Sequence, residues 1–148
     1  MSKKSRSEGN RVACAIKANK SPYYIADVDL DDNVEDVLNA SISVRKTLGK
    51  CSSGYMLISA GVTHLIVVID LVDSPNLSAK DWLSYALLGI SDTYSQEGNN
   101  SLFAKAVISI DTPFKLKDTV RSNGFGVLRS RSLIEEEESD EDELFNFD

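Results

Sequence analysis

A chain of 148 residues with 42% hydrophobic content fits one folded domain and excludes a protein disordered throughout. Residues 65–69 form an apolar run as long as any in the chain, far short of the ~20 residues that span a bilayer, so we expect no membrane contact. The formal charge of −7 is segregated: residues 1–20 hold six basic residues and one acid, and residues 135–148 hold nine acids and no base.

The first segments favour a disordered basic N-terminus followed by a β-hairpin. Residues 1–10 are polar and small, and we expect them to be disordered. Residues 11–19 and 22–30 each alternate apolar and polar positions loosely, and the polar stretch between them ends in Pro22. We therefore predict two strands joined by a turn.

Residues 32–48 carry conflicting signals. Alternation around Ile42 favours a strand, but the end signals favour a helix. Asp32 and Glu35 form a capping-box pattern, and Gly49 stands where a C-terminal cap belongs. Four apolar residues share one helical face: Val37, Ala40, Val44 and Leu48. We predict a helix, although the sequence leaves the strand alternative open.

The remaining elements follow in order. Residues 54–72 predict a second hairpin whose second strand is central, because residues 65–69 are apolar on both sides. Ser78 begins a helix that carries the apolar residues Trp82, Leu83, Ala86, Leu87 and Ile90. Residues 102–110 predict a strand, residues 113–123 a short helix ending before Gly124, and residues 125–134 a last strand.

The predicted order is ββαββαβαβ, which indicates a single small α+β domain with a mixed or antiparallel sheet and two to three helices. We expect a disordered N-terminus over residues 1–10, a globular domain over residues 11–134 and a disordered acidic–aromatic tail over residues 135–148. The first five elements are similar in order to the core of roadblock and longin domains, which implies a small dimerising scaffold and makes a homo-oligomer compatible with the sequence.

Possible metal ligands occur early in the chain. Asp27, Asp29 and Asp31 have the spacing of the first ligands of an EF-hand loop. Asp32 stands where that loop needs glycine, and Leu38 where it needs a bidentate glutamate. The sequence therefore predicts no metal site, and no motif indicates a cofactor.

No complete catalytic motif is present. Asp70 follows an apolar strand, but the P-loop that accompanies such an acid in nucleotide-binding enzymes is missing. His64 is the sole histidine, and no sequence feature places a nucleophile beside it. An enzyme that uses Asp70 or Cys51 is the weakest of three hypotheses. Cys14 and Cys51 without a secretion signal predict reduced thiols in the cytoplasm or nucleus.

A basic segment near the end of the domain suggests phosphate binding. Its members are Lys115, Lys117, Arg121, Phe125, Arg129 and Arg131. Cations beside an exposed aromatic side chain are typical of surfaces that hold phosphates and stack bases. The alternative is that Phe125 is buried and the cations form a solvated face.

The acidic tail, residues 135–148, carries Leu144, Phe145 and Phe147 among its acids. Spaced aromatics beside acids form a short linear motif, in which charge steers the encounter and aromatics fill a pocket. The acids nearest to them are Asp140, Glu141, Asp142 and Glu143. Ser139 precedes these acids and is a candidate phosphorylation site.

"ESDEDELFNFD" is similar in style to the acidic, phenylalanine-containing ends of eukaryotic ribosomal stalk P proteins. It also resembles the acidic, phenylalanine-ended tails of single-stranded DNA-binding proteins. Either resemblance implies recruitment of a partner protein, although the Ala/Gly-rich hinge of a stalk protein is missing here.

The sequence thus favours a non-enzymatic adaptor or assembly factor whose tail docks a partner protein. The alternative is a nucleic-acid-associated protein that binds phosphates through the basic segment Lys115–Arg131, with the tail as a recruiting or autoinhibitory peptide.

Overall fold

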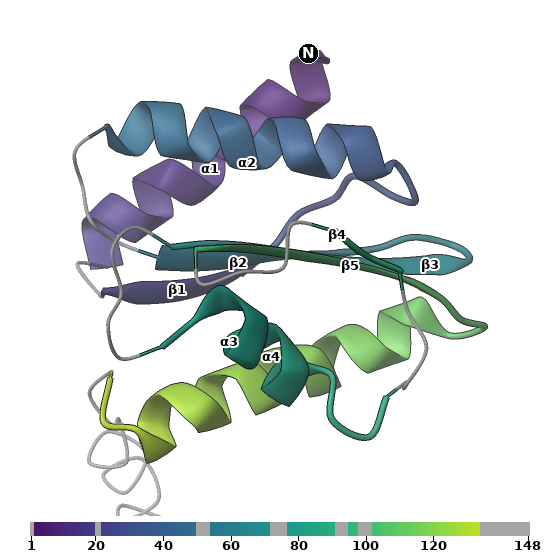
Figure 1. Ribbon diagram of the computed structural model, residues 1–148. Coiled ribbons are helices and arrows are strands. Elements are labelled where there is room, and N and C mark those ends of the chain that lie inside the picture. Colours follow the sequence, from purple (N-terminus) through teal and green to yellow (C-terminus); the bar gives the residue numbers. More distant parts are fainter. Residues whose placement is uncertain are drawn as a thin grey trace, which may run out of the picture.

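The computed structural model describes residues 2–19, 22–49, 54–71, 77–90, 95–97 and 102–133. A mixed five-stranded sheet lies between two pairs of helices, with α1 and α2 on one face and α3 and α4 on the other (Figure 1). The elements are α1 (Lys3–Asn19), β1 (Tyr23–Asp27), α2 (Val34–Leu48), β2 (Gly54–Ala60), β3 (His64–Asp70), α3 (Ala79–Ala86), β4 (Ser95–Glu97), β5 (Phe103–Ser109) and α4 (Pro113–Ser130). This architecture confirms the predicted α+β class of a small single domain.

The strands are arranged in the order β1-β2-β3-β5-β4. Helix α2 connects the parallel pair β1–β2, and the other neighbouring strands are antiparallel. Strand β3 is central and apolar on both sides, as predicted, and each face of the sheet buries its own hydrophobic cluster. Within the described residues, no helix is long and apolar enough to cross a membrane.

The predicted helix at residues 32–48 is confirmed as α2, and Gly49 is its C-terminal cap. Its predicted face, Val37, Ala40, Val44 and Leu48, is buried. The N-terminal cap is Asn33, whose side chain accepts a hydrogen bond from the N–H of Asp36. The prediction that Asp32 caps the helix is therefore wrong by one residue, and Asp32 binds a different part of the chain.

The prediction of disorder at residues 1–10 and of a strand at residues 11–19 is wrong, because Lys3–Asn19 is the helix α1. Its buried positions are spaced by three or four residues: Ser5, Gly9, Val12, Ala13 and Ile16. A Cβ atom on Gly9 would lie 2.6 Å from the Cβ of Ser43, so α1 packs on α2 at very short range. Burial of this face, rather than local alternation, determines the structure of the segment.

The prediction of a last strand at residues 125–134 is also wrong, because α4 continues through Gly124 to Ser130. It ends in a Schellman motif: Ser132 has a positive φ of 57°, and the N–H of Leu133 donates to the carbonyl of Leu128 at 2.8 Å. Gly124 serves close packing, since a Cβ there would lie 2.8 Å from Cδ1 of Ile25. The element order is therefore αβαββαββα, and the expected likeness to roadblock and longin domains in their first five elements fails.

Candidate functional site

A pocket of about 450 Å³ lies where the parallel strands β1 and β2 end, between α1 and the start of α4. Ligands of open sheets often bind outside the carboxyl ends of parallel strands. The pocket is lined by Glu8, Arg11, Asp27, Val28, Asp29, Ile58, Ala60, Phe114 and Lys117. Charged side chains from both faces of the sheet therefore meet around the end of β1.

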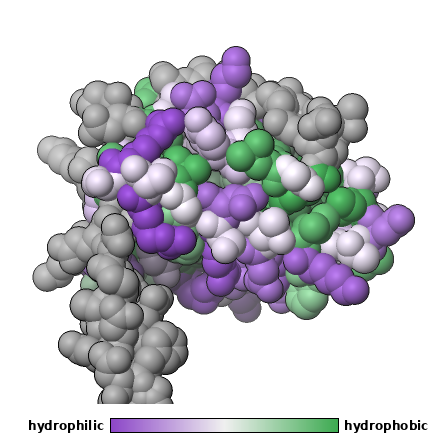
Figure 2. Space-filling model, turned by 90° about the horizontal axis from the view of Figure 1, so that it is seen from below, coloured by the Kyte–Doolittle hydropathy of each residue, from purple (hydrophilic) through white to green (hydrophobic). Residues whose placement is uncertain are grey.

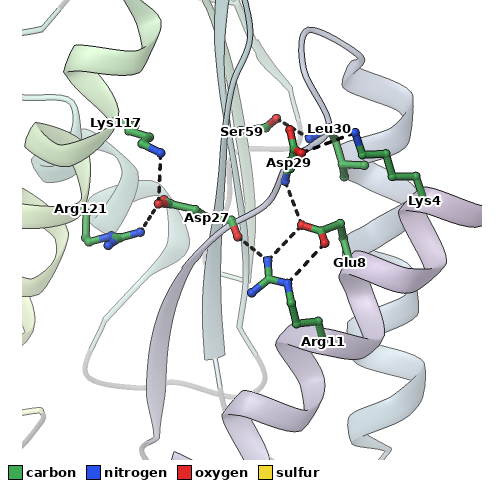
Figure 3. A network of polar contacts seen from close by, with 9 residues as sticks. All are labelled: Lys4, Glu8, Arg11, Asp27, Asp29, Leu30, Ser59, Lys117 and Arg121. Carbon is green, nitrogen blue, oxygen red and sulfur yellow. Dashed lines mark hydrogen bonds and ion pairs between the residues drawn. The ribbon is translucent and has the colours of Figure 1, made fainter.

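Asp27, the last residue of β1, joins this strand to α4. Its Oδ2 atom forms one ion pair with Lys117 Nζ at 3.6 Å and another with Arg121 (Figure 3). Lys117 and Arg121 are one helical turn apart, so both reach the same carboxylate. All three side chains are partly exposed, and solvent screening therefore keeps the contribution of these pairs to stability modest.

Arg11 joins α1 to the same strand from the other side (Figure 3). Its Nη2 atom donates to the carbonyl of Asp27 at 2.7 Å and to Glu8 Oε1 at 3.0 Å. Glu8 also accepts a hydrogen bond from the N–H of Asp29, which forms an ion pair with Lys4 at 3.6 Å. Partial burial raises the pKa of Glu8, but the hydrogen bonds from Arg11 and Asp29 outweigh it and hold the pKa below its usual value.

In this network, cations and anions from α1, the end of β1 and α4 contact one another and hold the three elements together. We call it the clamp; its members are Lys4, Glu8, Arg11, Asp27, Asp29, Lys117 and Arg121. Two features remain for a ligand. Oδ1 of Asp27 is buried and accepts no hydrogen bond within the described part of the chain. The ring of Phe114 is 67% exposed, and Nζ of Lys117 lies 4.2 Å from its centroid. Phe114 could stack on a planar group. The predicted basic segment began at Lys115 and therefore did not include it.

The residues of the predicted basic segment are dispersed along α4 and its end. Lys117 and Arg121 are the two that the structure brings together, and both pair with Asp27. Lys115 and Arg129 are exposed. Phe125 is partly buried and packs against the core between the sheet, α3 and α4. Arg131 follows α4, and its guanidinium lies over the ring of Tyr85 at 5.4 Å.

The predicted partner-binding residues lie outside the described residues. They are Asp140, Glu141, Asp142, Glu143, Leu144, Phe145 and Phe147, together with the candidate phosphorylation site Ser139. Cys51 is also outside the described range, whereas Cys14 is exposed on α1.

Asp32 and His64 lie together at the β2–β3 turn. Asp32 accepts hydrogen bonds from the backbone N–H groups of Val62, Thr63 and His64, at 3.2, 3.4 and 2.9 Å respectively. Nδ1 of His64 is 2.8 Å from the hydroxyl of Thr63 and 3.9 Å from the Asp32 carboxylate. In a catalytic triad, the acid and the nucleophile contact opposite ring nitrogens of the histidine. Here the Thr63 hydroxyl and the Asp32 carboxylate both lie near Nδ1, so these contacts stabilise a turn.

We expect stability to depend on pH through Asp32. Desolvation raises the pKa of Asp32, but the three backbone hydrogen bonds outweigh it, and the pKa lies below the ordinary 3.8. A lowered native pKa stabilises the fold above the unfolded value, and this contribution disappears as the pH falls through the native value. Urea unfolding of wild type and Asp32→Asn at pH 2–7 should show a stability difference that is largest near neutral pH and shrinks in acid. Parallel curves would contradict the assignment.

Asp70 ends β3 and forms an ion pair with Arg45 of α2 at 3.0 Å. The Arg45 guanidinium also lies 5.0 Å from the ring centroid of Tyr55. Burial raises the pKa of the Tyr55 hydroxyl, which donates to the carbonyl of Ser41 at 2.8 Å and stays neutral. These contacts hold α2 on the sheet. Among the described residues, no group of three or more His, Cys, Asp or Glu side chains could hold a metal ion.

No family model and no curated protein matches the chain.

Proposed function

We propose that this protein is a non-enzymatic adaptor or assembly factor that captures a partner protein with its acidic tail. The observation that carries the proposal is the composition of residues 135–148, in which nine acids accompany Leu144, Phe145 and Phe147. Apolar side chains lower the solubility of a charged segment unless a partner receives them. Acids that steer the encounter and aromatics that anchor it are a common division of labour in recognition.

The folded domain supports this role by giving the tail a defined point of departure. Leu133 packs against the hydrophobic core, and the Schellman motif fixes the direction of the chain after α4. The charged clusters among the described residues join the helices to the sheet. Their contacts stabilise the fold, as expected of a domain that serves as a scaffold. We place the protein in the cytoplasm or nucleus as part of the same proposal.

We expect the triple variant Leu144→Ala, Phe145→Ala, Phe147→Ala to lose partner capture, because it removes the anchors and keeps all nine acids. The measurement is affinity capture from cell extract by the immobilised full chain, with competition by a synthetic peptide of residues 135–148. The matched control, Glu135→Gln, Glu136→Gln, Glu137→Gln, keeps the anchors and should weaken capture mainly at low salt. Equal capture by wild type and the triple-alanine chain would contradict the proposal.

A second candidate function, binding of nucleic acid through the basic segment Lys115–Arg131, is supported by the exposed ring of Phe114 beneath Lys117. Base stacking on such a ring is worth about 1–3 kcal/mol per base. Binding of single-stranded nucleic acid should then weaken upon Phe114→Ala. Because Lys117 and Arg121 already pair with Asp27, the salt dependence should reflect only a few phosphate contacts.

A further inference from the structure

We propose that the acidic tail docks on its own domain, in the groove between α3 and α4, and that a partner protein must displace it. This inference rests on the proposed function of the tail and adds a regulation to it. The groove has a volume of about 320 Å³ and is lined by Tyr85, Leu88, Ser122, Asn123, Gly126, Val127, Ser130 and Arg131. We call it the α3–α4 groove.

The α3–α4 groove offers apolar surface to an incoming side chain. Leu88 is 62% exposed and Tyr85 is 42% exposed. Figure 2 views the molecule from below, the side on which α3 and α4 lie in Figure 1, and shows hydrophobic and hydrophilic side chains interleaved there. Gly126 leaves the groove open, because a Cβ atom there would have no neighbour within 4 Å. The amide of Asn123 donates to the carbonyls of Ala86 and Leu88, which ties the end of α3 to α4 and fixes the floor of the groove.

Charge distinguishes this groove from the other two described pockets. The pocket at the end of β1 is lined by the acids Glu8, Asp27 and Asp29 and by the cations Arg11 and Lys117, so its acids outnumber its cations by one. The pocket beside the start of α2 is lined by three more acids, Asp31, Asp32 and Asp36, and by one cation, Lys4. Among the described residues, the α3–α4 groove has no acidic lining residue, and Arg131 contributes a positive charge. By its charge, a segment with nine acids therefore matches the α3–α4 groove better than the other two pockets.

The tether makes docking in cis efficient. Ser130 and Arg131 line the groove, and the tail follows only a few residues later. The ten residues 134–143 separate the last described residue from Leu144 and can span up to about 33 Å. A short linker within one chain gives an effective concentration in the millimolar range, so contacts that would be weak between separate molecules suffice here. Leu144, Phe145 and Phe147 can thus reach Leu88 and Tyr85 while the acids remain near Arg129 and Arg131.

A fluorescent peptide of residues 135–148 tests the inference on the full-length chain by anisotropy. The triple-alanine chain keeps the groove but lacks the competing side chains. We expect it to bind the peptide at least ten-fold more tightly than wild type, whose own tail occupies the groove, with weaker binding as salt rises. Gly126→Leu in the triple-alanine chain should fill the groove and reduce this affinity at least ten-fold. Leucine favours a helix more than glycine does, so this variant is expected to fold.

Ser7→Leu, on the exposed side of α1 across the sheet, is the matched control and should leave peptide binding unchanged. No binding of the peptide to the triple-alanine chain, or binding that Gly126→Leu leaves intact, would overturn the inference. A different result would contradict the proposed function alone. In that case the peptide would bind the groove, but neither wild type nor any variant would capture a partner protein that the free peptide displaces. If both hold, Gly126→Leu in the otherwise wild-type chain should increase partner capture, because the tail is released.

Discussion

Replacing Trp82 by alanine is expected to lower the free energy of unfolding by about 3–5 kcal/mol, the usual cost of removing a buried tryptophan. Trp82 is fully buried on α3, and its ring meets that of Tyr23 edge-on, with centroids 5.8 Å apart. Its Nε1–H donates to the carbonyl of Gly124 at 3.2 Å. One side chain therefore joins β1, α3 and α4, and alanine would leave a cavity and remove a buried hydrogen bond.

Equilibrium denaturation with urea, followed by circular dichroism, measures the effect. Lys80→Ala on the exposed side of the same helix is the control and should change stability by no more than about 0.5 kcal/mol. A loss below about 1 kcal/mol for Trp82→Ala would contradict the packing of α3 between β1 and α4.

The second large effect is expected from Gly9→Ala, which should destabilise the protein by about 1–3 kcal/mol. Alanine in a helix is normally more stable than glycine by up to about 1 kcal/mol. At Gly9, however, the added methyl group would lie 2.6 Å from the Cβ of Ser43 and 2.8 Å from the carbonyl oxygen of Ala40. The backbone of α2 must then move away from α1.

Gly126→Ala is the matched control, since it introduces the same methyl group at a helical glycine with no neighbour within 4 Å. It should raise stability by about 0.5–1 kcal/mol. Opposite signs for the two substitutions in thermal and urea unfolding would support close packing of α1 on α2. Stabilisation by both would mean that the two helices are not in close contact.

Close packing of small residues also explains why α1 was not predicted. Its buried face contains Ser5, Gly9 and Ala13, which carry little hydrophobic signal. The larger residues Val12 and Ile16 are four apart, but with the intervening Cys14 they also fit an alternating pattern. Propensity and alternation describe neighbouring residues, whereas the helix exists because α2 and the sheet cover its small residues.

The sequence predicted the end of α4 too early for a related reason. Gly124 in a sequence predicts the end of a helix, because glycine is the usual C-terminal cap. Here it is fully helical and allows α4 to approach Ile25 and Trp82. By contrast, the existence and type of α2, the hairpin of β2 and β3, α3 and β5 were predicted correctly, since their apolar patterns agree with their packing. The exceptions are at the helix ends: Asn33 rather than Asp32 caps α2, and α3 ends at Ala86, before the predicted Ile90.

The clamp at the end of β1 was beyond sequence reasoning. The spacing of Lys117 and Arg121 is visible in the sequence once a helix is assumed, but Asp27 is far away along the chain. The sequence predicts that residues 22–30 pair with a strand at residues 11–19. It therefore gives no indication that Asp27 lies between the helices α1 and α4. The groove between α3 and α4 was missed for the same reason, because its residues belong to two segments that only the fold brings together.

The clamp has a consequence for how the protein behaves when concentrated. Strand β1 is an edge strand of the sheet. The unpaired backbone groups of an edge strand can form hydrogen bonds with a strand of another molecule. Arg11 donates a hydrogen bond to the carbonyl of Asp27, at the end of this strand. Lys117 and Arg121 place positive charge beside the carboxylate of the same residue. An approaching strand would have to remove the guanidinium of Arg11 and desolvate these cations. The same side chains that hold the helices in place therefore hinder the addition of a foreign strand at this edge of the sheet.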